Sequence, residues 1–252
     1  MTGDIGFGLI GAGTVGRLHA GYLSKVPGAR LVAVSDVDRT AADAAAREHG
    51  EIVVHENTMS LLADGAVAAV VIATPGETHG RIIEAAASAG KHVFCEKPLD
   101  LDLARIDRAL EAVCKAGVTL QVGFNRRFDR NFQFVRDALA GGKVGEPHII
   151  HLISRDPLLP GPPRDVGPLA GLLFDTTIHD FDMVRFLTGS EFDEVYVLPG
   201  DHVHRSGVID TAVVSFRLAN GVIGTIDNSQ AAYGYDQRVE VFGSNGAIAI
   251  EN

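Results

Sequence analysis

Apolar and polar positions alternate with two different periods along this chain. Up to about residue 124, short apolar runs typical of buried strands are separated by Ala-rich segments whose apolar residues recur with helical spacing. Parallel strands need a crossover connection, which is usually a helix, so this order predicts a parallel sheet with helices on both faces. The predicted strands are IGFGLIG (5–11), LVAVSD (31–36), VAAVVIAT (67–74), HVFCE (92–96) and TLQVGF (119–124), and the predicted helices cover 14–26, 39–49, 78–90 and 102–116.

The pattern changes after about residue 125. A helical stretch (126–140) is followed by the strand-like run PHIIHLIS (147–154), a Pro- and Gly-rich loop (156–171) and a second helix. From residue 191 onward the alternation is that of antiparallel strands, and the turns at 219–221 and 243–246 suit hairpins. The predicted strands of this part are EVYVL, DTAVVSFRL, GVIGTIDNSQ, QRVEVFG and GAIAIE.

The two patterns predict two globular domains and an α/β fold class. A nucleotide-binding domain (1–124) precedes an α+β domain (125–252) with an open, largely antiparallel sheet. The chain has 252 residues, of which 46% are hydrophobic and 21% are charged. It is therefore long and apolar enough to bury a substantial core.

Charge and cysteine content narrow the possible partners. A formal net charge of -10 without a run of Lys or Arg argues against nucleic acid or an anionic membrane, which leaves small molecules and proteins. Cys95 and Cys114 are too few for a disulfide framework or a thiolate zinc site, and a cytoplasmic location fits them. No basic segment precedes the first apolar run, and no stretch approaches the roughly 20 apolar residues that span a bilayer. We expect neither export nor a membrane span.

The stretch GAGTVG (11–16) has the G-x-G-x-x-G spacing of dinucleotide-binding loops. It follows a predicted strand and opens a predicted helix, so Gly11 suits the tight turn, Gly13 the approach of a pyrophosphate and Gly16 close helix–strand packing. The amides at the helix start would face the phosphates, and the alternative is a tight turn without a ligand. The residues of this loop that we assign to the cofactor are Gly11, Gly13, Thr14, Val15 and Gly16.

Asp36 ends the second predicted strand, 20 residues after Gly16. A carboxylate there accepts hydrogen bonds from the ribose hydroxyls and repels a 2′-phosphate, which favours NAD over NADP. Arg39 leaves the opposite possibility open, because an arginine three residues later can hold a 2′-phosphate. The other residues that we assign to the cofactor are Arg39, Thr74, Pro75, His79, Glu96 and Lys97.

Lys97 lies in CEKPL (95–99), at the carboxyl end of the predicted strand 92–96. That end of an open α/β sheet faces the ligand crevice, so a lysine there is well placed for chemistry. The bond between Lys97 and Pro98 can be cis at modest cost, which would fix the direction of the lysine. The alternative interpretation is a surface lysine that opens a helix.

The stretch LLFDTTIHDFDM (172–183) has the pattern of a helix. At 3.6 residues per turn, Asp175, His179 and Asp182 share one stripe, beside an apolar stripe of Phe174, Ile178 and Phe181. Taken alone, the polar stripe is best interpreted as the solvent-facing side of an amphipathic helix. A cation site is conceivable from this spacing, but no further ligands cluster around it, and we predict no metal.

These stretches together resemble the Gfo/Idh/MocA oxidoreductases, and within them the inositol dehydrogenases. The resemblance runs over the whole chain, and the EKP stretch with the Asp-x-x-x-His helix is fairly specific for the family. The stretches that carry it are GLIGAGTVGRLHA (8–20), EKPL (96–99), GFNRRFDRNF (123–132), HLISRDP (151–157), LFDTTIHDFDM (173–183) and YGYDQRVEVFGSNG (233–246).

The resemblance implies a Rossmann domain that binds NAD and a homo-oligomer, commonly a tetramer that forms through the open sheet. It also implies that Lys97, Asp175 and His179 are the catalytic residues. Asn125 and Arg127 would lie at the edge of the cofactor and substrate cleft, and Asp175, His179 and Tyr235 would also be substrate-binding residues. Tyr235 is alternatively a subunit contact.

This chain differs from the family in two places. Such proteins continue with further strands and helices after the hairpin at 243–246, and their loop before the helix has paired glycines where this chain has LAG. Loops over a scaffold commonly set substrate preference, so this loop is where the preference could differ from that of the family.

The chemistry of alcohol oxidation agrees with these residues. A hydride passes to the nicotinamide and the hydroxyl proton to a base, and histidine titrates near neutrality, so His179 is the expected base. The ammonium of Lys97 would stabilise the negative charge that develops on the reacting oxygen, and Asp175 would hold a neighbouring hydroxyl or orient the imidazole. The predicted reaction is the NAD-dependent oxidation of a cyclic polyol, myo-inositol to 2-keto-myo-inositol (scyllo-inosose). The alternatives are a dehydrogenase of another inositol isomer or sugar, and a catalytically silent NAD-binding sensor or subunit.

Overall fold

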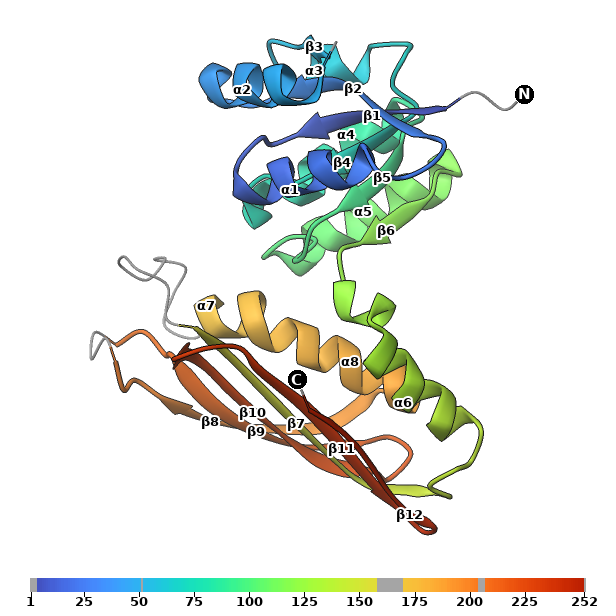
Figure 1. Cartoon of the computed structure of the whole chain (residues 1–252), viewed down its shortest axis with the longest axis vertical. Coiled ribbons are helices and arrows are strands. Elements are labelled where there is room, and N and C mark those ends of the chain that lie inside the picture. The colour runs from blue at the N-terminus through green and yellow to red at the C-terminus, as the bar shows by residue number, and fades with distance from the viewer. Residues whose placement is uncertain (1–3, 51, 158–169, 204–206, 252) are drawn as a thin grey trace. The chain divides into compact units, whose positions relative to one another are not determined.

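The computed structural model describes residues 4–50, 52–157, 170–203 and 207–251 (Figure 1). The chain divides into two compact units, Met1–Gly123 and Phe124–Asn252. Most of the predicted loop 156–171 lies outside the described residues. Among the helices in the described ranges, none is long and apolar enough to cross a membrane.

The described strands of the first unit form a parallel sheet. Their order is β3-β2-β1-β4-β5-β6, which is the strand order of the Rossmann fold. Successive strands are added to one side of β1 up to β3, and from β4 onward they are added to its other side. The carboxyl ends of the strands beside this change of side form the ligand crevice in such sheets. The strands are β1 (Ile5–Ile10), β2 (Ala29–Ser35), β3 (Val53–Val54), β4 (Ala69–Ile72), β5 (His92–Cys95) and β6 (Leu120–Val122).

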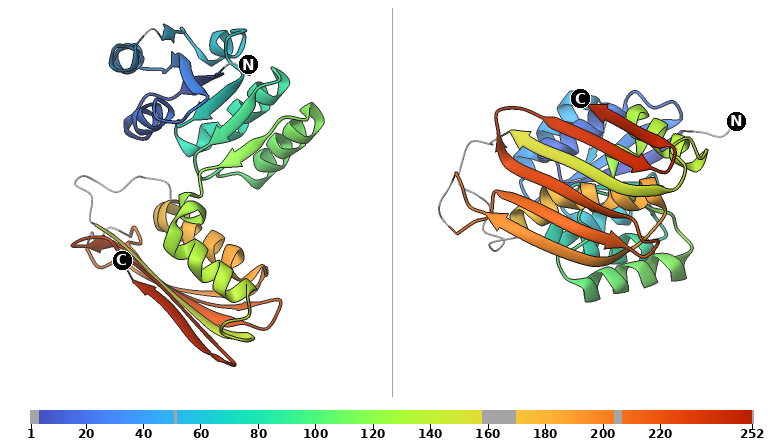
Figure 2. Two further views of the ribbon diagram at one scale, coloured as in Figure 1. Left: turned by 45° about the vertical axis from the view of Figure 1, so that its right-hand side comes forward. Right: turned by 90° about the horizontal axis from the view of Figure 1, so that it is seen from below.

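Helices cover both faces of this sheet, as predicted (Figures 1 and 2). Successive residues of a strand point to opposite faces, and Leu9 and Ile10 of β1 are buried in two different core clusters. Asp38 and Asp102 accept hydrogen bonds from backbone N–H groups at the starts of their helices, which satisfies donors without an intrahelical partner. The helices are α1 (Thr14–Leu23), α2 (Arg39–His49), α3 (Thr58–Leu62), the 3₁₀ turn η1 (Gly76–Thr78), α4 (His79–Ser88) and α5 (Leu103–Ala116).

The elements β3 and α3 lie in a stretch for which the sequence predicted no element. A strand of two residues is too short to show alternation, and α3 has only five residues. Its start is nevertheless encoded locally, because Asn57 and Ser60 form a reciprocal capping box.

The second unit is built on a mixed, mostly antiparallel sheet, as predicted. Its strand order is β12-β11-β7-β10-β9-β8, in which β7 and β10 run parallel and the other neighbours are antiparallel. The predicted hairpins at 219–221 and 243–246 join β9 to β10 and β11 to β12. The strands are β7 (Pro147–Pro157), β8 (Phe192–Gly200), β9 (Thr211–Leu218), β10 (Ile223–Ala232), β11 (Asp236–Gly243) and β12 (Gly246–Glu251).

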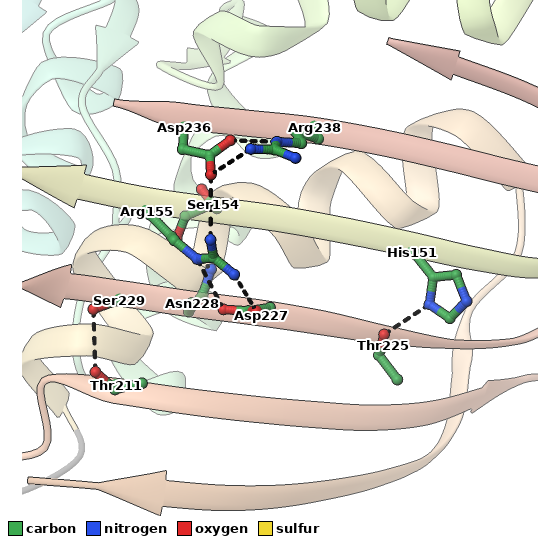
Figure 3. Close-up of polar contacts among 10 residues, drawn as sticks. All are labelled: His151, Ser154, Arg155, Thr211, Thr225, Asp227, Asn228, Ser229, Asp236 and Arg238. Atoms are coloured by element: carbon green, nitrogen blue, oxygen red, sulfur yellow. Dashed lines mark hydrogen bonds and ion pairs between the residues drawn. The ribbon is translucent and has the colours of Figure 1, made fainter. Parts of the chain in front are cut away.

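The helices α6 (Arg130–Ala140) and α8 (Ile178–Thr188) pack on one face of this second sheet (Figures 1 and 2). Alternate strand residues such as Ile150, Leu152 and Ile226 fill the core between the helices and the sheet. The opposite face carries a group of charged side chains near the carboxyl end of β7 (Figure 3). There Arg155 of β7 forms ion pairs with Asp227 of β10 and Asp236 of β11.

The predicted regular helix over 172–183 is wrong in one respect. The chain forms a short α-turn, α7 (Ala170–Leu172), then a π-helical segment, η3 (Leu173–Thr177), before α8 begins at Ile178. A π-helical turn takes in one more residue than an α-helical turn, so a stripe calculated at 3.6 residues per turn does not hold across it. A separate difference is that Asp182, within α8, is 5% exposed and does not lie on a solvent-facing side.

Candidate active site

Glycine suits positions 11, 13 and 16 of the 11–16 loop for different structural reasons. Gly11 has a φ of +94°, and a Cβ there would lie 2.7 Å from the Ala73 carbonyl carbon. A Cβ on Gly16 would lie 1.9 Å from the Gly11 carbonyl oxygen. Gly13, in contrast, has no atom of the described residues within 4 Å of its Cβ position. The fold requires Gly11 and Gly16, whereas the open space above Gly13 fits the close approach of a dinucleotide pyrophosphate.

Replacing Gly16 by alanine is expected to raise the dissociation constant for NADH by about 10-fold or more, because the Cβ must displace the Gly11 carbonyl and with it the phosphate-binding turn. Gly21→Ala is the matched control on the same helix, since no described atom lies within 4 Å of its Cβ position. Fluorescence titration with NADH measures both. Unchanged affinity in Gly16→Ala would show that the loop does not hold the cofactor.

The carboxylate of Asp36 is held at the end of β2 by two backbone donors. Ala12 N donates to its Oδ2 at 2.6 Å, and Asp38 N donates to its Oδ1 at 2.8 Å. The first of these bonds ties the carboxylate directly to the glycine loop. Arg39 is exposed, and its Nε donates to Asp43 Oδ1 at 2.9 Å, one turn along α2. An exposed pair of this kind contributes little energy, so it leaves the charge of Arg39 available to a ligand.

Two loops at the carboxyl edge of the parallel sheet are joined by His79. The imidazole is 1% exposed, its Nδ1 lies 2.6 Å from the Pro98 carbonyl oxygen, and its Nε2 lies 2.8 Å from the Thr74 carbonyl oxygen. Thr74 is further held through its hydroxyl, 2.7 Å from that of Thr78, at the turn that follows Pro75. The structure thus brings together the loops after β4 and β5. Cofactor contacts of Thr74, Pro75 and His79 stay a prediction.

Lys97 directly follows β5, and its bond to Pro98 is cis. The preceding Glu96 is partly buried and accepts a hydrogen bond from the Lys97 backbone N at 3.3 Å. Its carboxylate also lies 2.7 Å from Nε2 of His19 on α1. Burial alone raises the pKa of Glu96, but the hydrogen bond and charge of His19, together with the Lys97 backbone and charge, hold this pKa below its usual value. Glu96 is therefore a carboxylate at neutral pH.

The contact between His19 and Glu96 was not predicted from the sequence. The two residues are 77 positions apart, and His19 has the spacing of an ordinary residue on the first helix. Only the packing of α1 beside β5 brings them together. The contact anchors the residue before Lys97 to the helix that begins in the glycine loop.

Two candidate residues of the second unit, His179 and Arg127, contact the ring of Phe124. The ring of His179, in the first turn of α8, stands edge-on to Phe124 with 6.1 Å between centroids. Asn125 and Arg127 lie in the 3₁₀ turn η2 (Asn125–Phe128), and the Arg127 guanidinium is 5.9 Å from the Phe124 centroid. His179 is half-buried, whereas Asn125 is exposed.

Arg127 and Asp182 form a bidentate ion pair, with Nε 2.8 Å from Oδ2 and Nη2 2.5 Å from Oδ1. This pair explains why Asp182 is buried, and it leaves the substrate contact of Arg127 as a prediction. Asp175 lies exposed in η3. Tyr235 lies in the turn between β10 and β11 and is 73% exposed. Within the described ranges, no group of three or more His, Cys, Asp or Glu residues has the arrangement of a metal site.

The chain matches two family models. The model described as "Oxidoreductase family, NAD-binding Rossmann fold" covers residues 5–124, and the "GFO/IDH/MocA C-terminal domain" covers residues 132–249. The order of these two domains agrees with the two sheets described above. The expected resemblance to Gfo/Idh/MocA oxidoreductases is confirmed.

Individual relatives are similar over nearly the whole chain. Inositol 2-dehydrogenase of Rhizobium meliloti is 46% identical over 98% of this chain and 75% of its own length. Myo-inositol 2-dehydrogenase of Thermotoga maritima is 44% identical over 97% of this chain and 75% of its own length. The structure of myo-inositol dehydrogenase from Lactobacillus casei in complex with NAD(H) and myo-inositol superposes with a TM-score of 0.92, at 27% identity over 99% of this chain and 74% of that one.

Proposed function

Since the chain belongs to the Gfo/Idh/MocA oxidoreductase family and has its NAD-binding Rossmann domain, we propose that it oxidises myo-inositol to 2-keto-myo-inositol (scyllo-inosose) with NAD⁺. The observation that carries most weight is the junction of η3 and α8. Asp175, an exposed carboxylate, lies in η3, and His179, a half-buried imidazole, lies four residues later in the first turn of α8. A base beside a hydroxyl-binding carboxylate is the combination that polyol oxidation requires. The names of relatives at 44% and 46% identity support the substrate class.

In the proposed mechanism, His179 accepts the proton of the reacting hydroxyl as the C–O bond becomes a carbonyl. Lys97 donates a hydrogen bond to the same oxygen and stabilises the negative charge that develops there. Asp175 accepts a hydrogen bond from a neighbouring ring hydroxyl, which orients the polyol. NAD⁺, when bound, supplies the hydride acceptor. Asn125, Arg127 and Tyr235 are proposed to contact the rim of the polyol.

The chain's own residues for the dinucleotide are those of the glycine loop and Asp36. The amides of Gly13, Thr14 and Val15 would hold the pyrophosphate at the start of α1. Asp36 would accept hydrogen bonds from the adenosine ribose, because its carboxylate is already fixed beside the loop by Ala12. This assignment proposes NAD, rather than NADP, as the preferred cofactor.

Replacing Asp36 by serine is expected to raise the ratio of NADP⁺ to NAD⁺ efficiency by about 10-fold or more, since it removes a charged acceptor and the repulsion of the 2′-phosphate. The ratio of kcat/KM values for the two cofactors measures this. Asp43→Ser is the matched variant, because it releases Arg39 and leaves Asp36 in place. Equal use of NAD⁺ and NADP⁺ by the unmodified protein would mean that Arg39 outweighs Asp36.

The reaction is tested by the rise of NADH absorbance when the protein meets NAD⁺ and one of three substrates: myo-inositol, scyllo-inositol or glucose. We expect the highest kcat/KM with myo-inositol. A higher value with scyllo-inositol or glucose would favour a dehydrogenase of another isomer or a sugar. Binding of NADH without turnover of any polyol would favour the silent NAD-binding protein instead.

We also propose that the chain assembles as a homo-oligomer through the open face of the second sheet. Tyr196 and Leu198 of β8 are 73% and 72% exposed there, and large exposed apolar side chains often mark protein contacts. The ion pairs of Arg155 lie on the same sheet (Figure 3). Light scattering after size-exclusion chromatography gives the number of subunits, and a monomer would contradict this proposal.

A further inference from the structure

A buried polar cluster connects the start of α8 to the second sheet. Asp180 is 1% exposed, and its two carboxylate oxygens accept hydrogen bonds from Arg126 Nη1 at 2.6 Å and from Asn228 Nδ2 at 2.8 Å. Arg126 Nη2 also donates to the hydroxyl of Ser154 at 2.7 Å. Ser154 and Asn228 lie on the neighbouring strands β7 and β10 (Figure 3). The cluster therefore ties η2, α8 and two strands together.

A second buried residue anchors the π-helical segment to the same two strands. Thr176 is 1% exposed, and its hydroxyl donates to Asp156 Oδ2 at 2.9 Å. The same hydroxyl accepts a hydrogen bond from Gln230 Nε2 at 2.9 Å. Asp156 lies on β7 and Gln230 on β10. Both hydrogen-bonding roles of the hydroxyl are used, so its orientation is determined by the sheet.

Each of these two buried residues, Thr176 and Asp180, is the next residue in the sequence after a candidate catalytic residue. Thr176 follows Asp175 directly, and Asp180 follows His179 directly. In each pair the second residue is buried and bonded to the sheet, while the first is exposed or half-buried. Fixing the backbone at the anchor limits the directions that the preceding side chain can take. Phe124, whose ring contacts that of His179, directly precedes η2, in which Arg126 of the same cluster lies.

We propose that Asp180 and Thr176 are positioning residues, which hold the backbone of the η3–α8 junction against β7 and β10 and so set the directions of His179 and Asp175. This inference rests on the proposed function, because the proposed function assigns catalytic roles to the side chains of His179 and Asp175. It adds a specific role for a buried ion pair and a buried hydroxyl that lie outside the proposed substrate-binding residues.

The energetics of the ion pair agree with a role in geometry. Burial raises the pKa of Asp180, and the charge of Arg126 and the hydrogen bonds from Asn228 and Arg126 oppose this rise. Removing two charges from water offsets much of their attraction, so apolar residues of similar volume would often stabilise the fold as well. The directed hydrogen bonds of the pair orient the start of α8, which apolar packing would not do.

Asp180→Asn tests the proposal with little change of shape. The expected result is a fall in kcat for inositol of about 10- to 100-fold, because a displacement of about 1 Å from productive geometry has an effect of this size. The KM for NAD⁺ is expected to stay within about twofold, since the variant lies outside the Rossmann unit. Thr176→Val, which removes only the hydroxyl, is expected to lower kcat by about 3- to 10-fold. Glu191→Gln is the matched control, because it breaks the exposed ion pair with Arg185 near the other end of α8.

A second measurement is independent of turnover. The ring signals of His179 in ¹H–¹³C NMR spectra, assigned by their loss in His179→Gln, are expected to move in Asp180→Asn and to stay in Glu191→Gln. A wild-type protein that turns over no polyol would refute the proposed function, and the ring signals would then decide the positioning role by themselves. An Asp180→Asn variant with kcat within twofold of wild type and unmoved His179 signals would overturn the proposal.

If Asp180→Asn does not fold, the double variant Arg126→Met/Asp180→Leu replaces both charges by apolar side chains. We expect this variant to fold, with kcat still at least about 10-fold below wild type and with displaced His179 signals. Wild-type kcat in the folded double variant would overturn the proposal, because the pair would then serve only to fill the core.

Discussion

Replacing His179 by alanine is expected to lower kcat for inositol oxidation by about 10²- to 10⁴-fold, the usual contribution of a general base. The proton of the reacting hydroxyl would then have to pass to water, which is a weaker base at neutral pH. Binding of NADH is expected to be unchanged, because the glycine loop and Asp36 lie in the first unit. Steady-state kinetics and NADH titration measure the two effects separately.

His151→Ala is the matched control for this variant. His151 is another histidine of the second unit, but it lies exposed on β7, where its Nδ1 contacts the hydroxyl of Thr225 at 2.8 Å (Figure 3). Added imidazole is expected to restore part of the turnover of His179→Ala and to leave His151→Ala unaffected. Wild-type kcat in His179→Ala would remove this residue from the mechanism.

Replacing Lys97 by alanine is expected to lower kcat/KM for inositol by about 10²- to 10³-fold, which is the effect of removing one donor to a developing oxyanion. Most of the loss is expected in kcat, because the interaction strengthens as charge develops on the oxygen. Lys97→Arg keeps the charge with a different donor geometry and is expected to recover only part of the activity.

The control for Lys97→Ala is Lys115→Ala, an exposed lysine in the last turn of α5 in the same unit. Its turnover should equal that of the wild type. NADH affinity in Lys97→Ala is expected to stay within about threefold, since the pyrophosphate and ribose contacts are elsewhere. Unchanged kcat in Lys97→Ala would contradict the proposed role in polarising the hydroxyl.

The parts of the fold that the sequence predicted are those encoded by local periodicity. Buried parallel strands appear as continuous apolar runs, amphipathic strands alternate, and turns such as that at Gly221 carry glycine where φ is positive. The glycine loop is also recognisable locally, because its G-x-G-x-x-G spacing lies within six residues and directly follows a strand. The resemblance to a family identified Lys97, Asp175 and His179 together as the expected catalytic residues.

The buried aspartates of α8 show what such reasoning does not predict. From the pattern alone, Asp175, His179 and Asp182 share one face, and Asp182 belongs to solvent. In the folded chain Asp182 pairs with Arg127, 55 positions away, and Asp180 pairs with Arg126, 54 positions away. A period calculated within one helix contains no information on partners from another element.

The two kinds of sheet, the dinucleotide loop and the residue types that alcohol oxidation needs could be predicted from the amino-acid sequence alone, because local propensity and side-chain chemistry suffice for these. The folded chain was needed to show which polar groups are buried and what holds them, such as His79 between two loops, Glu96 beside His19, and Asp180 against Arg126. The physical reason is that a buried polar group needs a partner, and that partner is brought by chain topology rather than by sequence neighbourhood.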